Sequence, residues 1–141
     1  ANFFPMKSAH KTAAAGKTAQ IEQVYSLIAR PYSAVVLGMG PDGHTASWFP
    51  NAVGLDAALD PNNSEQTAAI LAHKSNVTGA YLERITLTLS AIANAKAALL
   101  LISGAEKRQV FEDAVSSPQS RYPIRAAIDA LGDRLTVFYT D

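Results

Sequence analysis

Hydrophobic and polar positions along the chain follow the two periods that distinguish strands from helices. Short aliphatic runs predict buried strands, and segments with apolar residues three or four positions apart predict helices. The most apolar run, 97–102, predicts a central parallel strand covered on both faces. The expected strands are 32–37, 67–72, 83–88, 97–102 and 134–139, with a short edge strand at 2–6, and the expected helices are 18–29, 89–95, 106–114 and 123–131.

Helices that alternate with strands in this way are typical of an α/β domain with a mainly parallel sheet. The sequence contains no tandem repeat and no linker, so residues 1–141 are expected to form a single α/β domain. A chain of 141 residues is long enough to bury a sizeable core. The expected architecture is a three-layer α/β/α arrangement.

Composition and charge exclude several classes of function. The 12 basic and 12 acidic residues give no net charge, so nothing global attracts nucleic acid or an anionic membrane. The chain has no cysteine, and its three histidines are scattered, so we expect no metal site. No apolar run is long enough to span a membrane and no signal peptide is visible, which favours a cytoplasmic location.

The stretch richest in candidate chemistry directly follows the expected strand 32–37. It reads Gly38-Met39-Gly40-Pro41-Asp42-Gly43-His44. Because glycine accepts positive φ and has no Cβ, the backbone here can turn sharply and approach a ligand closely. Ligands bind in open α/β sheets at the carboxyl ends of strands. Asp42 and His44 are therefore candidate catalytic residues, and Gly38, Gly40 and Gly43 are candidate substrate-binding residues.

Each of these residues also has a purely structural interpretation. Asp42 is typical of a turn or a helix cap, and His44 alone would be an ordinary loop histidine. Their combination with three glycines after a buried strand favours function. The segment after Gly43 does not open a helix as a dinucleotide-binding loop requires, so we expect no nucleotide cofactor.

The longer segment 38–50 resembles the signature of the 6-phosphogluconolactonases, which share a superfamily with the glucosamine-6-phosphate deaminases. The pattern Gly-x-Gly-x-Asp-Gly-His-x-Ala is common to both branches, and the ending Thr-Ala-Ser-x-Phe-Pro is similar to the lactonase version. Deaminases carry a glutamate immediately before the proline. This chain has Phe49 there, which cannot take a proton.

Two basic residues are candidates for holding a phosphate. Lys107 lies at the start of an expected helix, where a cation is poorly placed for the helix dipole but well placed for a bound anion. Local pattern alone fits solvated surface charges equally well for Lys107, and better for Arg84. The segments Glu83-Arg84-Ile85-Thr86-Leu87-Thr88 and Ser103-Gly104-x-x-Lys107 are similar to the family's second and third motifs, however. The resemblance implies that Arg84 and Lys107 contact the substrate phosphate.

The resemblance also implies an activity, a carboxylic ester hydrolase of carbohydrate metabolism. The substrate would be a small sugar-phosphate lactone, 6-phosphoglucono-δ-lactone, hydrolysed to 6-phosphogluconate in the pentose phosphate pathway without a cofactor. His44 would act first as a general base and then as a general acid, with Asp42 orienting its ring. Backbone N–H groups of the glycine turn would support the developing oxyanion.

Two other functions stay open at this point. One is an isomerase or deaminase of amino-sugar phosphates, which would share Asp42 and His44. The other is a non-catalytic fragment that binds a sugar phosphate or a partner chain. Nothing in residues 1–32 matches the glycine-rich phosphate loop in the family's amino-terminal half, so we expect the chain to lack the amino-terminal part of the family domain.

Overall fold

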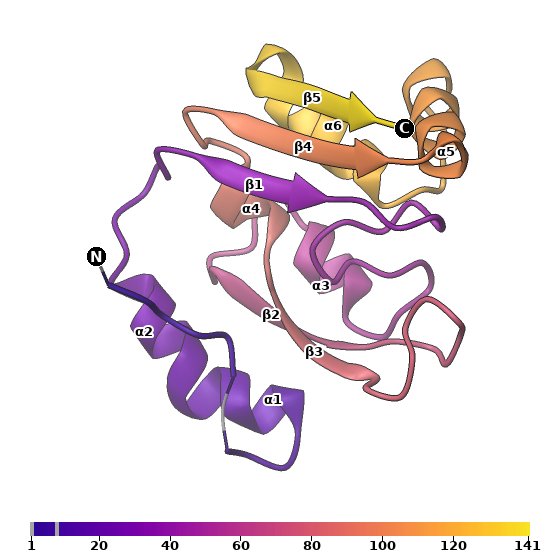
Figure 1. Ribbon diagram of the computed structural model, residues 1–141. Helices are drawn as coiled ribbons and strands as arrows, with labels where there is room; N and C mark the ends of the chain where they lie inside the picture. Colours follow the sequence, from indigo (N-terminus) through magenta and orange to yellow (C-terminus); the bar gives the residue numbers. More distant parts are fainter. Residues whose placement is uncertain (1, 8) are drawn as a thin grey trace.

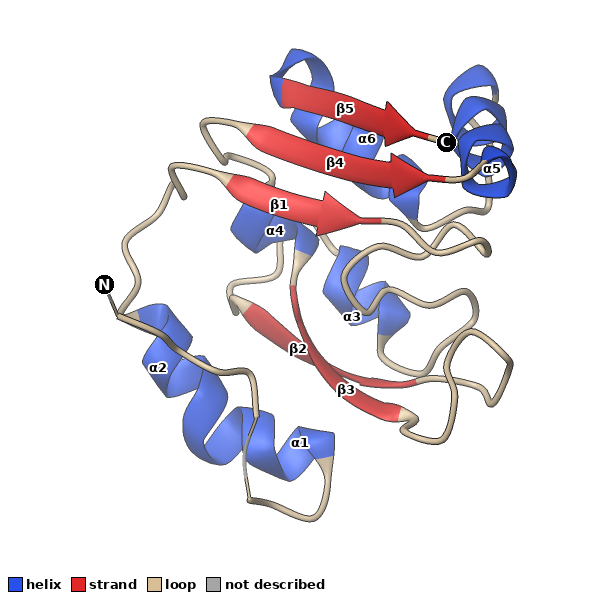
Figure 2. Cartoon of the chain, in the orientation of Figure 1, coloured by secondary structure: helices blue, strands red, loops and turns tan. Residues whose placement is uncertain are grey.

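The computed structural model describes residues 2–7 and 9–141. Strands and helices alternate around a mostly parallel sheet, which confirms the predicted α/β class (Figure 2). The expected edge strand at 2–6 is wrong, because this segment is irregular. Proline at position 5 has no N–H to donate to a neighbouring strand.

Two sheets form the frame of the molecule (Figure 1). Three strands pair in parallel in the order β1 (Val35–Gly38), β4 (Ala98–Ser103), β5 (Leu135–Thr140). The other two, β2 (Thr67–Leu71) and β3 (Glu83–Leu87), pair antiparallel in a separate sheet. Because β1 and β4 run in the same direction, the segments that follow them emerge at the same edge of the parallel sheet.

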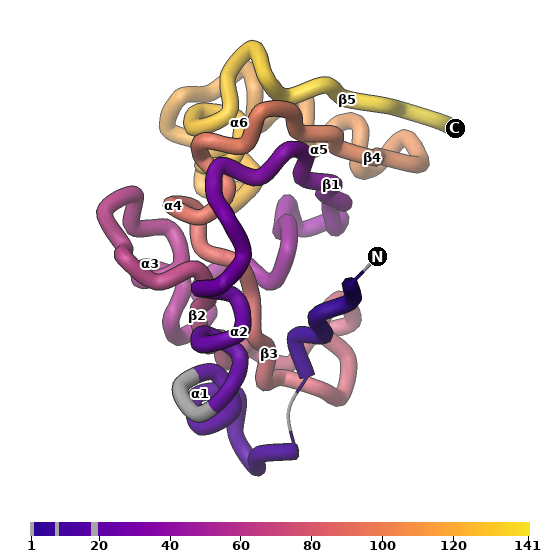
Figure 3. Tube along the Cα trace, turned by 90° about the vertical axis from the view of Figure 1, so that its left-hand side faces the viewer, coloured from indigo at the N-terminus to yellow at the C-terminus, as the bar shows by residue number. Residues whose placement is uncertain are grey.

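The helices are short, with one exception. The first three elements follow one another without a break, and only α5 is long enough for three turns. In chain order they are α1 (Ala13–Gly16), the π-helical turn η1 (Lys17–Ile21), α2 (Glu22–Ser26), α3 (Leu55–Leu59), α4 (Leu89–Ile92), α5 (Ala105–Ser116), α6 (Ile124–Leu131) and the 3₁₀ turn η2 (Gly132–Arg134). Figure 3 shows the parallel sheet with α5 and α6 in the upper part of the molecule, and α1 and α2 with β2 and β3 below.

The helical segment α1–α2 is fastened to the start of β2 by polar side chains. The Glu22 carboxylate accepts hydrogen bonds from the backbone N–H groups of Gln66 (2.7 Å) and Thr67 (2.8 Å). The Gln66 side chain is buried; it donates to the carbonyl of Tyr25 (2.6 Å) and accepts from the hydroxyl of Tyr32. Burial raises the pKa of the Tyr32 hydroxyl above its ordinary value of 10.0.

One face of the parallel sheet carries the core. Side chains of β1 and β4 alternate between the two faces, and the inward set packs against α4, α6 and the segment after β1. The largest fully buried side chain is Trp48. The buried set includes Val35, Leu37, Ala98, Leu100, Ile102, Trp48, Ile92, Ile124, Ala127 and Leu131.

The opposite face of the parallel sheet is uncovered. Val36 is 63% exposed, Leu101 52% and Phe138 53%, and the strand register places all three on the same face. The prediction that β4 is covered on both faces is therefore wrong for the part of the chain that the structure describes. The physical reason is that the described helices pack on the inward face alone.

Candidate active site

The loop that follows β1 is a closed turn, which we call the His44 loop (residues 39–45). Met39 and Thr45 pair across its base in an antiparallel bridge. The backbone N–H of Gly40 donates to the carbonyl of His44 (2.9 Å), and that of Gly43 donates to the carbonyl of Gly40 (3.0 Å). The fully buried hydroxyl of Thr45 donates to the carbonyl of Gly38 (2.8 Å). These bonds hold the loop at the carboxyl end of β1.

Asp42 and His44 interact directly within this loop. The Nδ1 atom of His44 lies 2.6 Å from Oδ1 of Asp42, and the backbone N–H of His44 donates to the same oxygen (3.2 Å). A carboxylate only accepts hydrogen bonds, so Nδ1 carries the shared proton and Nε2 is left as the basic nitrogen. The ring of Phe49 lies against the imidazole, with centroids 4.4 Å apart and planes inclined by 38°. Both neighbours fix the orientation of the ring.

Two of the glycines are required by close approach. A Cβ at Gly40 would lie 2.2 Å from Cε1 and Nδ1 of His44, so the imidazole occupies the space that a side chain would need. Gly43 adopts φ +74°, and a Cβ there would lie 2.6 Å from Cδ1 of Tyr122. The N–H groups of Gly40, Gly43 and His44 all donate inside the loop. These three N–H groups are therefore not free to bind a developing oxyanion.

His44 borders an open hollow with a volume of about 650 Å³. Lys107, in the first turn of α5, borders the same hollow. The reason is that β1 and β4 are parallel neighbours, so the His44 loop and α5, which follow them, both begin at the carboxyl edge of the sheet. Gly38 and Gly40 are also in its wall. The structure thus brings together Gly38, Gly40, His44 and Lys107, with Asp42 bonded to His44.

Sequence reasoning missed five residues of this wall. Met39, Pro41 and Ala46 are neighbours of predicted residues, whereas Asn76 and Val77 lie in the loop between β2 and β3. The only sequence signal at Asn76 and Val77 is the glycosylation pattern Asn76-Val77-Thr78, which does not indicate a ligand site. Only the pairing of β2 with β3 brings this loop to the hollow. No sequence motif could have found it.

Comparison with known proteins identifies the family of the chain. Residues 1–136 match the family described as glucosamine-6-phosphate isomerases/6-phosphogluconolactonase. The chain belongs to this family. None of the described residues forms a cluster of three metal-ligating side chains, and no described helix is both long and apolar enough to span a bilayer.

Individual members of the family are clearly similar. A 6-phosphogluconolactonase from Mesorhizobium japonicum is 43% identical over 109 residues, which is 77% of this chain and 43% of that protein. One from Rhizobium meliloti is 36% identical over 140 residues, 99% of this chain and 58% of that protein. The crystal structure of a 6-phosphogluconolactonase from Shewanella baltica superposes with a TM-score of 0.80 at 34% identity, over 96% of this chain and 55% of that one. The chain spans about half the length of the relatives it matches.

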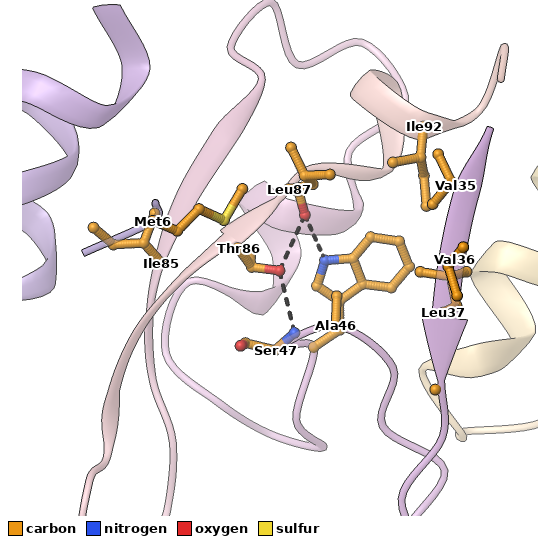
Figure 4. Close-up of a pocket in the computed structure, with 12 residues that line it drawn as sticks. Met6, Val35, Val36, Leu37, Ala46, Ser47, Ile85, Thr86, Leu87 and Ile92 are labelled. Carbon is orange, nitrogen blue, oxygen red and sulfur yellow. Dashed lines mark hydrogen bonds between the residues drawn. The ribbon is translucent and has the colours of Figure 1, made fainter. Parts of the chain in front are cut away.

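The end of the family signature holds the site to the second sheet (Figure 4). The indole Nε1–H of Trp48 donates to the carbonyl of Leu87 (2.9 Å), and the backbone N–H of Ser47 donates to Oγ1 of Thr86 (3.2 Å). These groups border an apolar hollow of about 230 Å³ between β1 and β3. In this member of the family, Ser47 and Trp48 therefore have a structural role: they join the His44 loop to β3.

Arg84 lies elsewhere. Its guanidinium donates to the carbonyls of Glu83 (3.2 Å) and Thr78 (3.2 Å), and it borders a separate hollow of about 320 Å³ together with Lys7 and Lys11. The structure does not bring Arg84 into the hollow of His44. Its contact with a substrate phosphate stays a prediction from the family motif.

Proposed function

We propose that the protein hydrolyses 6-phosphoglucono-δ-lactone to 6-phosphogluconate. The observation that carries this proposal is the hydrogen-bonded pair Asp42–His44 at the wall of a hollow that Lys107 also borders. The names of the relatives described above support the same activity.

The pair is suited to hydrolysing a cyclic ester. Nε2 of His44 takes a proton from water, and the water oxygen attacks the lactone carbonyl carbon. When the tetrahedral intermediate collapses, the bond from that carbon to the ring oxygen breaks, and the imidazolium returns the proton to this oxygen. Asp42 stabilises the imidazolium through Nδ1–H. One histidine is therefore sufficient for both proton transfers.

Lys107 is suited to the substrate's phosphate. Its ammonium and the N-terminal turn of α5 together favour an anion at this place. A phosphate held there would be remote from the reacting carbonyl, so its binding energy would position the lactone against His44. The family motif would add Arg84 to this anchor. A cytoplasmic location, which the implied pathway favours, also belongs to the proposal.

A second candidate function is isomerisation or deamination of an amino-sugar phosphate, because the family includes such enzymes. Phe49 argues against it, since its ring packs on His44 at the place where the deaminase pattern has an acid. Release of ammonia from glucosamine 6-phosphate measures this activity directly. We expect none.

The proposal is tested by substituting His44. His44→Ala removes the base but lies in a partly exposed position, so we expect kcat on freshly made lactone to fall about 100-fold or more with little change in melting temperature. The matched control is His73→Ala, because His73 is exposed and outside this hollow. Turnover by His44→Ala equal to that of His73→Ala would refute the assignment, and a folded wild-type protein without lactonase activity would refute the function.

The phosphate anchor is tested in the same assay. Lys107→Ala is expected to raise KM about 10-fold or more, because a charge-assisted contact to the phosphate is lost. Lys96→Ala is the matched control, since Lys96 precedes β4 at the edge opposite to α5. An unchanged KM in Lys107→Ala would place the phosphate elsewhere, with Arg84 as the next residue to test.

A further inference from the structure

The His44 loop has a second face, turned away from the hollow. The ring of Tyr122 packs on this face against Gly43, so closely that a Cβ at Gly43 would lie 2.6 to 2.8 Å from three of its carbon atoms. Tyr122 is half-buried and packs on the hydrophobic core, and it is not among the residues that border the hollow. It therefore has no route to a bound substrate through that hollow.

A hydrogen bond reinforces this contact. The backbone N–H of Ile124, the first residue of α6, donates to the carbonyl of Gly43 (2.9 Å). Ile124 is itself fully buried, which anchors the start of α6 in the core. Gly43 is thus held on this face by two contacts: the apolar contact with Tyr122 and the hydrogen bond from Ile124.

We propose that Tyr122 is a positioning residue for the Asp42–His44 pair. Its ring fixes Gly43 at positive φ, and this conformation directs the carboxylate and the imidazole toward each other. Without the ring, Gly43 keeps only its backbone hydrogen bonds to Gly40 and Ile124, so its positive φ and the 2.6 Å contact are held less firmly. The inference deepens the proposed function, because it rests on His44 being the base.

The contact is made by the inner part of the ring. The atoms that face Gly43 are Cβ, Cγ and Cδ1 of Tyr122, so the hydroxyl is not part of it. Tyr122→Phe is therefore the conservative variant and should keep the geometry. Tyr122→Ala and Tyr122→Ser both remove Cγ and Cδ1, and with them most of the contact to Gly43.

The test reads the proton on His44 and needs no enzymatic activity. In protein labelled with ¹⁵N-histidine, at alkaline pH where imidazoles are neutral, the nitrogen shifts report which ring nitrogen is protonated. The His44 signals are assigned by their loss in His44→Gln. We expect an excess of the Nδ1–H form in the wild type and in Tyr122→Phe, because Asp42 accepts that proton. In Tyr122→Ala this excess should be lost.

The control is Tyr81→Ala, which removes the same ring from an 81% exposed position outside the loop and should leave the His44 signals unchanged. Should Tyr122→Ala not fold, Tyr122→Ser takes its place. A folded Tyr122→Ala or Tyr122→Ser with the wild-type excess of Nδ1–H overturns the proposal, whatever the lactonase assay gives.

Kinetics supply a second readout if the lactonase is active. Tyr122→Ala is expected to lower kcat on the order of 10-fold or more and to leave KM within about twofold, because the anchor at Lys107 is untouched. Loss of lactonase in His44→Ala with normal kcat in Tyr122→Ala would refute the positioning role alone. Normal turnover in His44→Ala would refute the proposed function instead.

Discussion

At the scale of single residues, the geometry of the site depends on a glycine, Gly40, which has no side chain. Gly40 leaves room for the imidazole of His44, and its own φ is not in the left-handed region. The three atoms nearest to a methyl group at this position belong to the side chains of His44 and Asp42, and none of them is backbone. Its effect should therefore fall on the geometry of the catalytic pair and hardly on the fold.

We predict that Gly40→Ala lowers kcat about 100-fold. The added methyl group displaces the imidazole of His44 and breaks its hydrogen bond to Asp42. The free energy of unfolding should change by less than about 1 kcal/mol, since the ring can rotate away. Both quantities are measured on the same preparation, by lactonase assay and by urea unfolding.

Gly54→Ala is the matched control, because it should lower stability and leave kcat unchanged. Gly54 has φ +90°, and a Cβ there would lie 2.3 Å from the backbone oxygen of Ala69, which cannot move away cheaply. We expect a loss of about 1–3 kcal/mol of stability with kcat of the folded fraction unchanged. If Gly40→Ala instead loses stability and keeps kcat, the imidazole does not occupy the position described.

At the scale of elements, the buried side chain of Gln66 binds the carbonyl of Tyr25 in α2 and also accepts a hydrogen bond from Tyr32, in the segment between α2 and β1. The raised pKa of Tyr32 makes this attachment sensitive to alkali. Below pH 10 the hydroxyl is protonated in the folded and unfolded chains alike. Above it, the unfolded chain loses the proton first, so stability falls as pH rises from about 10 through the folded pKa.

We therefore predict that Tyr32→Phe flattens the decline of unfolding free energy between about pH 10 and 12, while lowering stability at neutral pH by about 1 kcal/mol through the lost hydrogen bond. The measurement is urea unfolding across this range. Tyr81→Phe, at an exposed ring, is the matched control. The same slope in Tyr32→Phe and the wild type would show that another group causes the decline.

Most elements could be predicted from the sequence because their signals are local. Aliphatic runs located β1, β4 and β5, and Gly38 to His44 marked the loop after β1. What could not be predicted depends on pairing between distant segments. Nothing in 67–72 or 83–88 reveals that these strands leave the parallel sheet, and Arg84 accordingly lies away from His44, while Asn76 lies beside it.

At the scale of the whole molecule, the parallel sheet has one packed and one open face. The apolar runs of β1 and β4 look the same in the sequence whether or not a second layer covers them. This is why sequence reasoning expected helices on both sides. The exposed apolar face formed by Val36, Leu101 and Phe138 should bind a hydrophobic dye.

We predict that Leu101→Lys, at the centre of this face, roughly halves the fluorescence of bound anilinonaphthalene sulfonate, because a charge interrupts the contiguous apolar surface. The matched control is Leu27→Lys, at an 85% exposed leucine that follows α2, which should leave the fluorescence unchanged. If Leu101→Lys and Leu27→Lys gave the same dye fluorescence, the side chain of Leu101 would be covered in solution, which would contradict the prediction.

The proposed catalytic pair and the proposed phosphate anchor come from different elements of the fold, so the two can change independently in evolution. Asp42 and His44 lie within one turn, whereas Lys107 arrives on a separate helix after a different strand. A shift of α5 along the sheet would alter the span between cation and imidazole and leave the pair itself intact. Under the proposed function, a change in the segment 103–107 would therefore alter the length of substrate that fits and leave the proposed proton-transfer pair unchanged.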